Sequence, residues 1–228
     1  MATLNYLQLT KRLQMECGVS GAPYATVQNL TGEPLRLATW INAAWLDIQA
    51  IHEDWQWLRV STSFVTVSGQ GQYTLAQCNT TNFGLWQRDT FRNYNTAAGT
   101  STEIFMPYVD YEEWRDGYLF GALRQTKTRP FVASIAPDKS ICLGPIPDVG
   151  YTVTADYFTK PVDLVLDADT PTIPDKFNMA IVYRAMMFYG DYEAAPEVIS
   201  RGASEFHKQL RRMECDRLPE VMTCGSLI

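Results

Sequence analysis

Histidine is scarce in this sequence, and the short patterns that mark common enzyme sites are missing. Only His52 and His207 occur in 228 residues, and their helical-wheel positions beside apolar stripes favour helix-surface residues over catalysts. No GxSxG, HExxH or GxxxxGK(S/T) pattern is present. The Gly69-Gln-Gly71 stretch lacks the third glycine of a dinucleotide-binding loop. We therefore predict that the protein is not an enzyme and uses no cofactor.

Cysteine pairs, long apolar runs and an excess of basic residues are missing as well. The five cysteines show no CxxC spacing, which argues against zinc motifs and a disulfide framework and favours folding in a reducing cytoplasm. No apolar run reaches the roughly 18 residues that a membrane span needs, and the charged N-terminal segment is unlike a signal peptide. The net charge of −6 argues against a protein whose main task is to bind phosphates.

Aspartates cluster late in the chain without the spacing of a known metal motif. A carboxylate metal site is conceivable, but the EF-hand pattern is absent. Interleaved prolines favour a turn-rich linker whose aspartates cap helices, so we predict no metal ion. The four aspartates are Asp163, Asp167, Asp169 and Asp175.

One loop is basic. Residues 122–130 contain Arg124, Lys127 and Arg129 among threonines. This loop could contact a phosphate backbone, although a solvated loop is the simpler interpretation.

Hydrophobic periodicity predicts two helices near the N-terminus. Residues 3–17 carry apolar side chains at helical spacing between a Thr3 cap and a Gly18 stop. Residues 34–57 carry an apolar stripe that steps by four and three residues, and they hold four of the six tryptophans. Most of this tryptophan surface is expected to belong to packing. Trp40 and Trp45 lie at opposite edges of the stripe, and Leu46 points away from it.

From residue 60 the alternation becomes typical of β-strands, and helical periodicity returns after a proline-rich stretch. The helical region that follows the proline-rich stretch begins with residues 175–190, which are apolar on nearly all sides. Such a helix is either central in its own core or partly buried by another subunit. The expected strands are 60–67, 73–75, 88–94, 131–135, 140–144 and 151–158, with a short helix at 110–120 and helices at 175–190 and 192–217.

These patterns predict an α+β fold. The N- and C-terminal helices, within residues 1–59 and 161–218, are expected to form one helical bundle, because no single helix here can bury its stripe alone. Residues 60–160 form an inserted antiparallel β module, and residues 219–228 form a flexible C-terminal tail.

The order of these elements resembles the head-to-tail adaptor, or connector, proteins of tailed bacteriophages. Most of the resemblance lies between residues 137 and 196, which include PDKSICLGPIPDVGYTVTADYFTKP and DTPTIPDKFNMAIVYRAMMFYGDYEAAP. It implies a structural virion protein that folds in the host cytoplasm and resides in the neck between head and tail. There it would form a ring beneath the portal, extend the DNA channel and provide the tail attachment surface.

The resemblance also implies the partners. They are the portal protein, further copies of the chain (probably about twelve in a ring), a tail or nozzle protein, and genomic DNA that passes through the lumen without sequence-specific binding. No membrane partner is expected. A mildly repulsive acidic wall would let DNA pass. We expect the free protein to be largely monomeric and to assemble on the portal.

Two interfaces are predicted under this interpretation. Aromatic and apolar residues of the tryptophan-rich helix are candidates for the contact between subunits: Trp40, Trp45 and Leu46. The end of the last helix and the tail are candidates for the portal contact: Lys208, Arg211, Arg212, Met213, Val221, Met222, Leu227 and Ile228.

Two other classes of protein stay open. One is a non-enzymatic ligand-binding module, for example for carbohydrate, in which exposed Trp86, Trp114 and Tyr118 form one groove on the β module. The other is an enzyme with an unrecognised carboxylate site.

Overall fold

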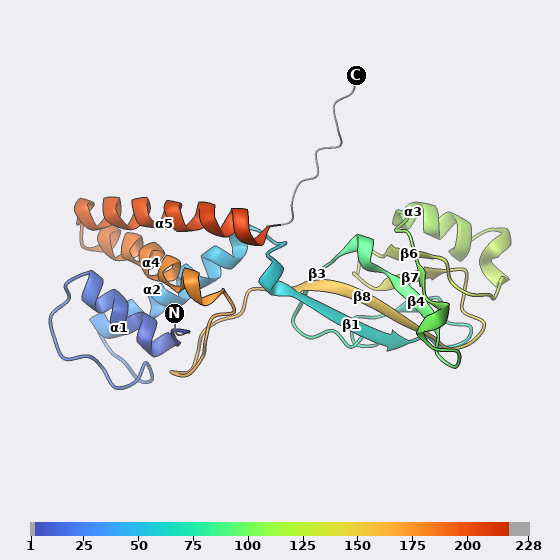
Figure 1. Ribbon diagram of the computed structural model, residues 1–228, viewed down its shortest axis with the longest axis horizontal. Helices are drawn as coiled ribbons and strands as arrows, with labels where there is room; N and C mark the ends of the chain where they lie inside the picture. The colour runs from blue at the N-terminus through green and yellow to red at the C-terminus, as the bar shows by residue number, and fades with distance from the viewer. Residues whose placement is uncertain (1–2, 219–228) are drawn as a thin grey trace, which may run out of the picture. The chain divides into compact units, whose positions relative to one another are not determined.

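The computed structural model describes residues 3–218, which contain both helices and antiparallel strands (Figure 1). This confirms the predicted α+β class. The chain divides into two compact units. The first, here called the helical unit, combines the chain up to Leu58 with the chain from Pro161; the second, the β unit, is Arg59–Lys160.

Helix α1 (Tyr6–Glu16) begins later than the sequence predicted. Its cap is Asn5, whose side chain accepts a hydrogen bond from the backbone of Gln8, while the Gln8 side chain accepts one from the backbone of Asn5. This reciprocal capping box satisfies two backbone donors that a helix start leaves free. The expected cap, Thr3, instead donates a hydrogen bond to the Asp175 carboxylate at 2.6 Å.

Helix α2 (Glu33–Ile51) ends before the expected position 57. His52 adopts an extended conformation, and the chain folds back. The indole nitrogen of Trp55 then donates a hydrogen bond to the carbonyl of Ile48 at 3.0 Å, which satisfies one of the last free carbonyls of the helix. Trp57 stacks on Trp55 with ring centroids 4.2 Å apart. Trp55 is therefore buried, as expected, but from a turn rather than from the helix.

Helix α4 (Asn178–Tyr192) is the central helix of its unit, because it contacts α1, α2 and α5 (Pro196–Arg217) (Figure 1). Its apolar circumference thus has partners within the same chain. The last helix begins at Pro196 rather than at residue 192, since proline suits the first helical turn and disfavours helix before it. The prediction that this helix ends at Gly190 was wrong, because α4 continues to Tyr192. Gly190 allows close packing, because a Cβ there would lie 2.7 Å from the side chain of Ile199.

The β unit contains two antiparallel sheets, and the long strand β8 is the centre of the larger one. β8 pairs with three other strands. In the larger sheet the strand order is β1 (Arg59–Val65), β8 (Tyr151–Thr159), β4 (Arg92–Asn95) and β5 (Ile104–Phe105), and β3 (Phe83–Trp86) also pairs with β8. In the smaller sheet the strand order is β2 (Gln72–Tyr73), β7 (Ile141–Gly144) and β6 (Val132–Ile135). The strands β3 and β5 were not predicted.

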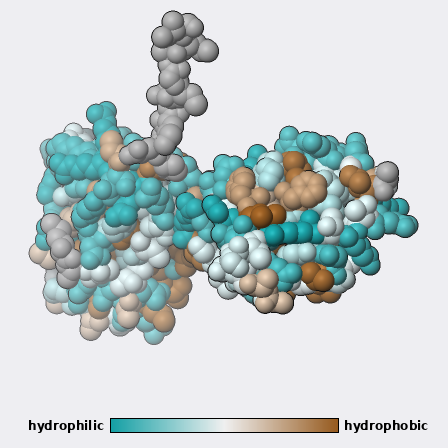
Figure 2. All heavy atoms as spheres, turned by 45° about the vertical axis from the view of Figure 1, so that its right-hand side comes forward, coloured by the Kyte–Doolittle hydropathy of each residue, from teal (hydrophilic) through white to brown (hydrophobic). Residues whose placement is uncertain are grey.

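Side chains from both sheets form one apolar cluster, which includes Phe64, Trp86, Phe91, Leu143 and Tyr157. A second, smaller cluster lies beneath helix α3 (Tyr111–Trp114) and the single π-helical turn Arg115–Leu119. The short helix expected at 110–120 is therefore present in this part of the β unit. Figure 2 shows separate hydrophobic patches on an otherwise mostly hydrophilic face.

Candidate functional site

The end of α5 carries unpaired positive charge. Arg211 and Arg212 are exposed, and within residues 3–218 neither of them forms an ion pair. Lys208 is also exposed but pairs with Glu205. Met213 is fully buried, so it belongs to the core of the helical unit and offers no surface to a partner. The other residues predicted for the portal contact, Val221, Met222, Leu227 and Ile228, lie outside the described residues.

The two arginines border a groove of about 600 Å³, here called the α5 groove. Across it, Lys176 pairs with Asp216 at 2.8 Å, and the hydrogen bond from Lys176 lowers the pKa of that carboxyl. These two charges cancel, so Arg211 and Arg212 leave the groove positive. Its remaining lining residues are Phe177, Gln209 and Cys215.

The tryptophan-rich helix contributes one core residue and two partly exposed ones. Trp45 is 2% exposed, and its indole nitrogen donates to the carbonyl of Val162 at 2.9 Å. Trp40 and Leu46 remain partly exposed. Of the three residues predicted for the subunit contact, only these last two therefore present surface on the helical unit.

Trp40 belongs to an aromatic groove between α2 and α4. Its ring meets Tyr189 edge-on at 5.9 Å and Tyr192 at 5.6 Å. Arg36 lies over the Tyr192 ring at 4.6 Å and donates to its hydroxyl. The groove, of about 340 Å³, is lined by Trp40, Ala43, Phe188, Asp191 and Tyr192. Sequence reasoning missed Phe188 and Tyr192, although their spacing of four residues places both on one face of α4.

A second surface, here called the apolar ledge, consists of Val162, Val165 and Leu166, which are exposed by 51%, 61% and 58%. The linker that carries it is held by side-chain hydrogen bonds from α2. Asn42 bonds both Asp163 and the backbone of Leu164, each at 2.8 Å. Sequence reasoning had not singled out these exposed apolar residues.

The aspartate cluster stabilises this linker. Asp167 accepts a hydrogen bond from the backbone of Val27 at 2.7 Å, and Asp169 accepts two, from Val165 and Leu166, each at 2.7 Å. These two bonds lower the pKa of Asp169. The side chains of Asp167 and Asp169 thus bind backbone donors of loops, and the expectation that the aspartate side chains cap helices was wrong. The backbone carbonyls of the same two residues nevertheless accept hydrogen bonds from the first two amides of α1. Among residues 3–218, no group of three or more His, Cys, Asp or Glu could hold a metal.

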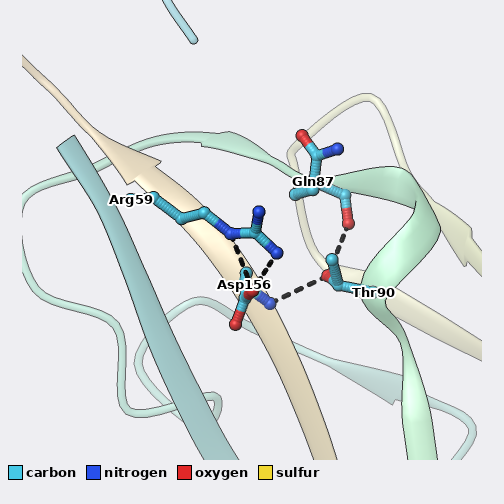
Figure 3. Close-up of polar contacts among 4 residues, drawn as sticks. All are labelled: Arg59, Gln87, Thr90 and Asp156. Carbon is cyan, nitrogen blue, oxygen red and sulfur yellow. Dashed lines mark hydrogen bonds and ion pairs between the residues drawn. The ribbon is translucent and has the colours of Figure 1, made fainter. Parts of the chain in front are cut away.

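The β unit has a polar groove of about 560 Å³ on the face of its larger sheet. Figure 3 shows the ion pair at its centre: Arg59 donates through two nitrogens to Asp156, and the Asp156 backbone donates to Thr90 at 2.9 Å. Thr90 in turn donates to the carbonyl of Gln87 at 2.8 Å. Because its central charges are paired, this groove suits hydrogen-bonded contacts rather than strong phosphate binding.

The basic loop is less basic at the surface than its sequence indicates. Arg129 is partly buried and donates to the side chain and the backbone carbonyl of Asn93, each at 2.8 Å. The guanidinium carbon of Arg129 lies 5.7 Å from the centre of the Tyr151 ring. Only Arg124 and Lys127 are exposed cations there.

The aromatic groove expected of a ligand-binding β module is not present. Trp86 is 2% exposed and Trp114 is 4% exposed. They belong to the two different apolar clusters of the β unit, and Tyr118 packs against the smaller one. The feature that would have favoured the alternative of a ligand-binding module is therefore absent from the described residues of the β unit.

Three of the cysteines and both histidines lie in settings that do not resemble a nucleophile–base pair. Burial raises the pKa of Cys17, Cys78 and Cys142 to about 12, which disfavours the reactive thiolate. His52 is bonded to Glu214 at 3.1 Å, and His207 donates to the carbonyl of Ala203 at 2.7 Å. Within residues 3–218, neither histidine is hydrogen-bonded to a serine, threonine or cysteine, as a nucleophile–base pair would require.

Comparison with known families gives one match across almost all of the chain. The family model described as SU10 adaptor protein matches residues 4–220. No curated protein matches the sequence. None of the helices in residues 3–218 has the length and apolar character of a membrane span.

Proposed function

The chain belongs to the SU10 adaptor protein family, whose members are structural head-to-tail adaptors of bacteriophages in the virion neck, and from this premise we propose how it acts there. Copies of the chain form a ring beneath the portal protein. The ring continues the DNA channel and presents the surface to which a tail or nozzle protein attaches. The family match over residues 4–220 is the observation that carries this proposal.

The portal contact is assigned to the α5 groove and the residues that follow α5. Two arginines that form no ion pair within residues 3–218, beside a partly apolar groove, suit a partner segment that combines carboxylates with an apolar anchor. The tail residues Val221, Met222, Leu227 and Ile228, although outside the described residues, supply further apolar side chains to the same proposal. Exposed Lys208 lies one helical turn before Arg211 and Arg212.

Contact between copies is assigned to the partly exposed residues of α2. Trp40 and Leu46 support it, since aromatic and aliphatic side chains with moderate exposure are typical of interface centres. DNA passes without base-specific contacts. The net charge of −6 supports this, because a wall that bound phosphates strongly would slow the movement of DNA.

Charge reversal tests the portal contact. The variant Arg211→Glu/Arg212→Glu should bind tail-less, portal-bearing heads at least about tenfold more weakly, because each lost charge-assisted contact is worth about 1.5 kcal/mol or more. The matched control, Arg124→Glu/Lys127→Glu, makes the same change in net charge on the β unit. Binding is measured by cosedimentation with heads.

The outcome separates a local contact from a general charge effect. Loss of binding in the first variant alone supports the α5 groove. Equal loss in both variants, or no loss in either, contradicts its assignment as the portal contact. Failure of the unaltered protein to bind portal-bearing heads contradicts the adaptor function itself.

A further inference from the structure

Two apolar surfaces of the helical unit are open to solvent. One is the aromatic groove, where Tyr192 is 53% exposed beside Trp40 and Phe188. The other is the apolar ledge, where Val165 and Leu166 are 61% and 58% exposed. The first is concave and aromatic, and the second presents exposed aliphatic side chains. Burial of one surface against the other would remove apolar area from water on both sides.

The rings of the aromatic groove are already held in position. The Arg36 guanidinium lies over the Tyr192 ring and also donates a hydrogen bond to the Tyr192 hydroxyl. The Trp40 ring packs against the rings of both Tyr189 and Tyr192. A partner that enters this groove would order few additional side chains. Binding to it would therefore lose little conformational entropy.

The backbone of the ledge is held by hydrogen bonds. The backbone of Val162 is bonded to the side chain of Gln49 at 3.1 Å, and the carbonyl of Val165 accepts a hydrogen bond from Gln28 at 2.6 Å. The amides of Val165 and Leu166 are bonded to Asp169. With these backbone groups satisfied, the aliphatic side chains can be buried by a partner without leaving their amides unpaired.

The two surfaces lie on opposite sides of α2. Trp40 and Ala43 line the groove, whereas Trp45 and Gln49 hold the ledge segment. At about 100° per residue, these two pairs point roughly half a turn apart, with the buried stripe of the helix between them. A head-to-tail ring contact joins two different patches of the same chain, and in a ring of many subunits those patches face nearly opposite directions.

We propose that the apolar ledge of one copy docks into the aromatic groove of the next copy. This inference rests on the proposed ring and names the two halves of its lateral contact. The groove is bordered by Arg36, which forms no ion pair within the described residues, and is lined by Asp191, so its charges nearly cancel; Asp163 of the ledge segment is the charge that Arg36 would face. Val162, Val165 and Leu166 are buried against Trp40, Phe188 and Tyr192 of the neighbour.

Cysteine cross-linking tests the contact in assembled necks. The background carries Cys215→Ser and Cys224→Ser, since Cys215 is exposed, while Cys78 and Cys142 are buried and Cys17 is half-buried with a raised pKa. In this background, Leu166→Cys marks the ledge and Asp191→Cys marks the groove. Three proteins are compared: each single variant and the double variant, all bound to portal-bearing heads and oxidised before denaturing electrophoresis.

The double variant should give a ladder of multimers beyond the dimer, and each single variant should remain monomeric. Binding to heads without a ladder would overturn the proposed contact. Dimers from a single variant, or cross-links to a different virion protein, would also overturn it, because they require a symmetric contact or another occupant. If the unaltered protein does not bind portal-bearing heads, the proposed function is contradicted, and the proposed contact is contradicted with it.

A second variant distinguishes docking from folding. Val165→Glu/Leu166→Glu changes only exposed side chains, so its thermal unfolding should match that of the unaltered protein. It should nevertheless reduce the number of copies on each head at least about tenfold, because carboxylates in an aromatic groove would be buried without partners. Unchanged copy number would contradict the docking proposal.

Discussion

Gln49 and Asn178 are both buried amides of the helical unit, each 2% exposed, but their hydrogen bonding differs. The Gln49 amide accepts from the backbone of Val162 and donates to its carbonyl and to that of Trp45. Within residues 3–218, neither polar atom of the Asn178 side chain has a hydrogen-bond partner. One amide therefore stabilises the linker, and the other leaves two polar atoms unpaired in the interior.

Leucine substitutions at these two sites should have opposite effects. Gln49→Leu leaves the amide of Val162 unpaired and should lower the free energy of unfolding by about 1–3 kcal/mol. Asn178→Leu removes two unpaired polar atoms and should raise it by about 1 kcal/mol. Urea unfolding monitored by tryptophan fluorescence measures both. Marked destabilisation by Asn178→Leu would show that this amide has a partner such as buried water.

The pH dependence of stability should report on Asp169. Its pKa is lowered in the folded protein by the amides of Leu166 and Val165, from an ordinary value of 3.8. A lowered folded-state pKa stabilises the fold above the unfolded-state value, and this contribution is lost as the pH falls through the folded-state value. Asp169→Asn should thus be less stable than the unaltered protein at pH 7. The difference should shrink below the ordinary pKa; a difference that stays constant with pH would contradict this account.

At the scale of the elements, α4 and α5 pack closely because of glycine. A Cβ at Gly202 would lie 2.9 Å from the carbonyl of Tyr183 and 3.2 Å from the Cβ of Met186. Gly202→Ala should therefore destabilise the protein by about 1–2 kcal/mol, even though alanine favours helices. Ser204→Ala, an exposed change on the same helix, is the control and should be neutral or slightly stabilising. Thermal unfolding that shows a more stable Gly202→Ala would contradict the close packing.

The sequence predicted the identity of the long elements better than their ends. The apolar stripe predicted for α2, with its steps of four and three residues, was correct for Leu37, Ile41, Ala44 and Ile48, which are fully buried, but not for Ile51, which is 38% exposed. Its end was not, because the hydrogen bond from Trp55 to Ile48 depends on a turn that periodicity does not describe. Short strands such as β5, two residues long, carry too little pattern to be recognised.

The candidate interfaces were less predictable than the helices. Trp45 was placed at the edge of a stripe, but the linker that covers it comes from residues more than 100 positions later. Met213 was assigned to a partner surface at the end of the last helix, but it is buried in the core. The apolar ledge was missed because its exposure follows from hydrogen bonds between distant segments. A helical wheel contains no information on such contacts.

At the scale of the whole molecule, assembly should depend on the portal. Adaptor subunits that joined in solution would form rings away from heads, so the free protein should be largely a monomer of 25.8 kDa. The firmly held groove and ledge would then bind each other only when a template brings many copies together. Sedimentation velocity at micromolar concentration measures this. A stable ring of the purified protein would contradict portal-dependent assembly.

The most direct test of the adaptor function counts bound copies on heads that differ only in the portal. Purified protein is mixed with tail-less heads that contain the portal and with matched heads that lack it, and bound protein is quantified at saturation. We predict saturation at one ring, about twelve copies, for each portal vertex, and no binding to heads without a portal. Absence of saturable binding, or equal binding to both kinds of head, would contradict the account.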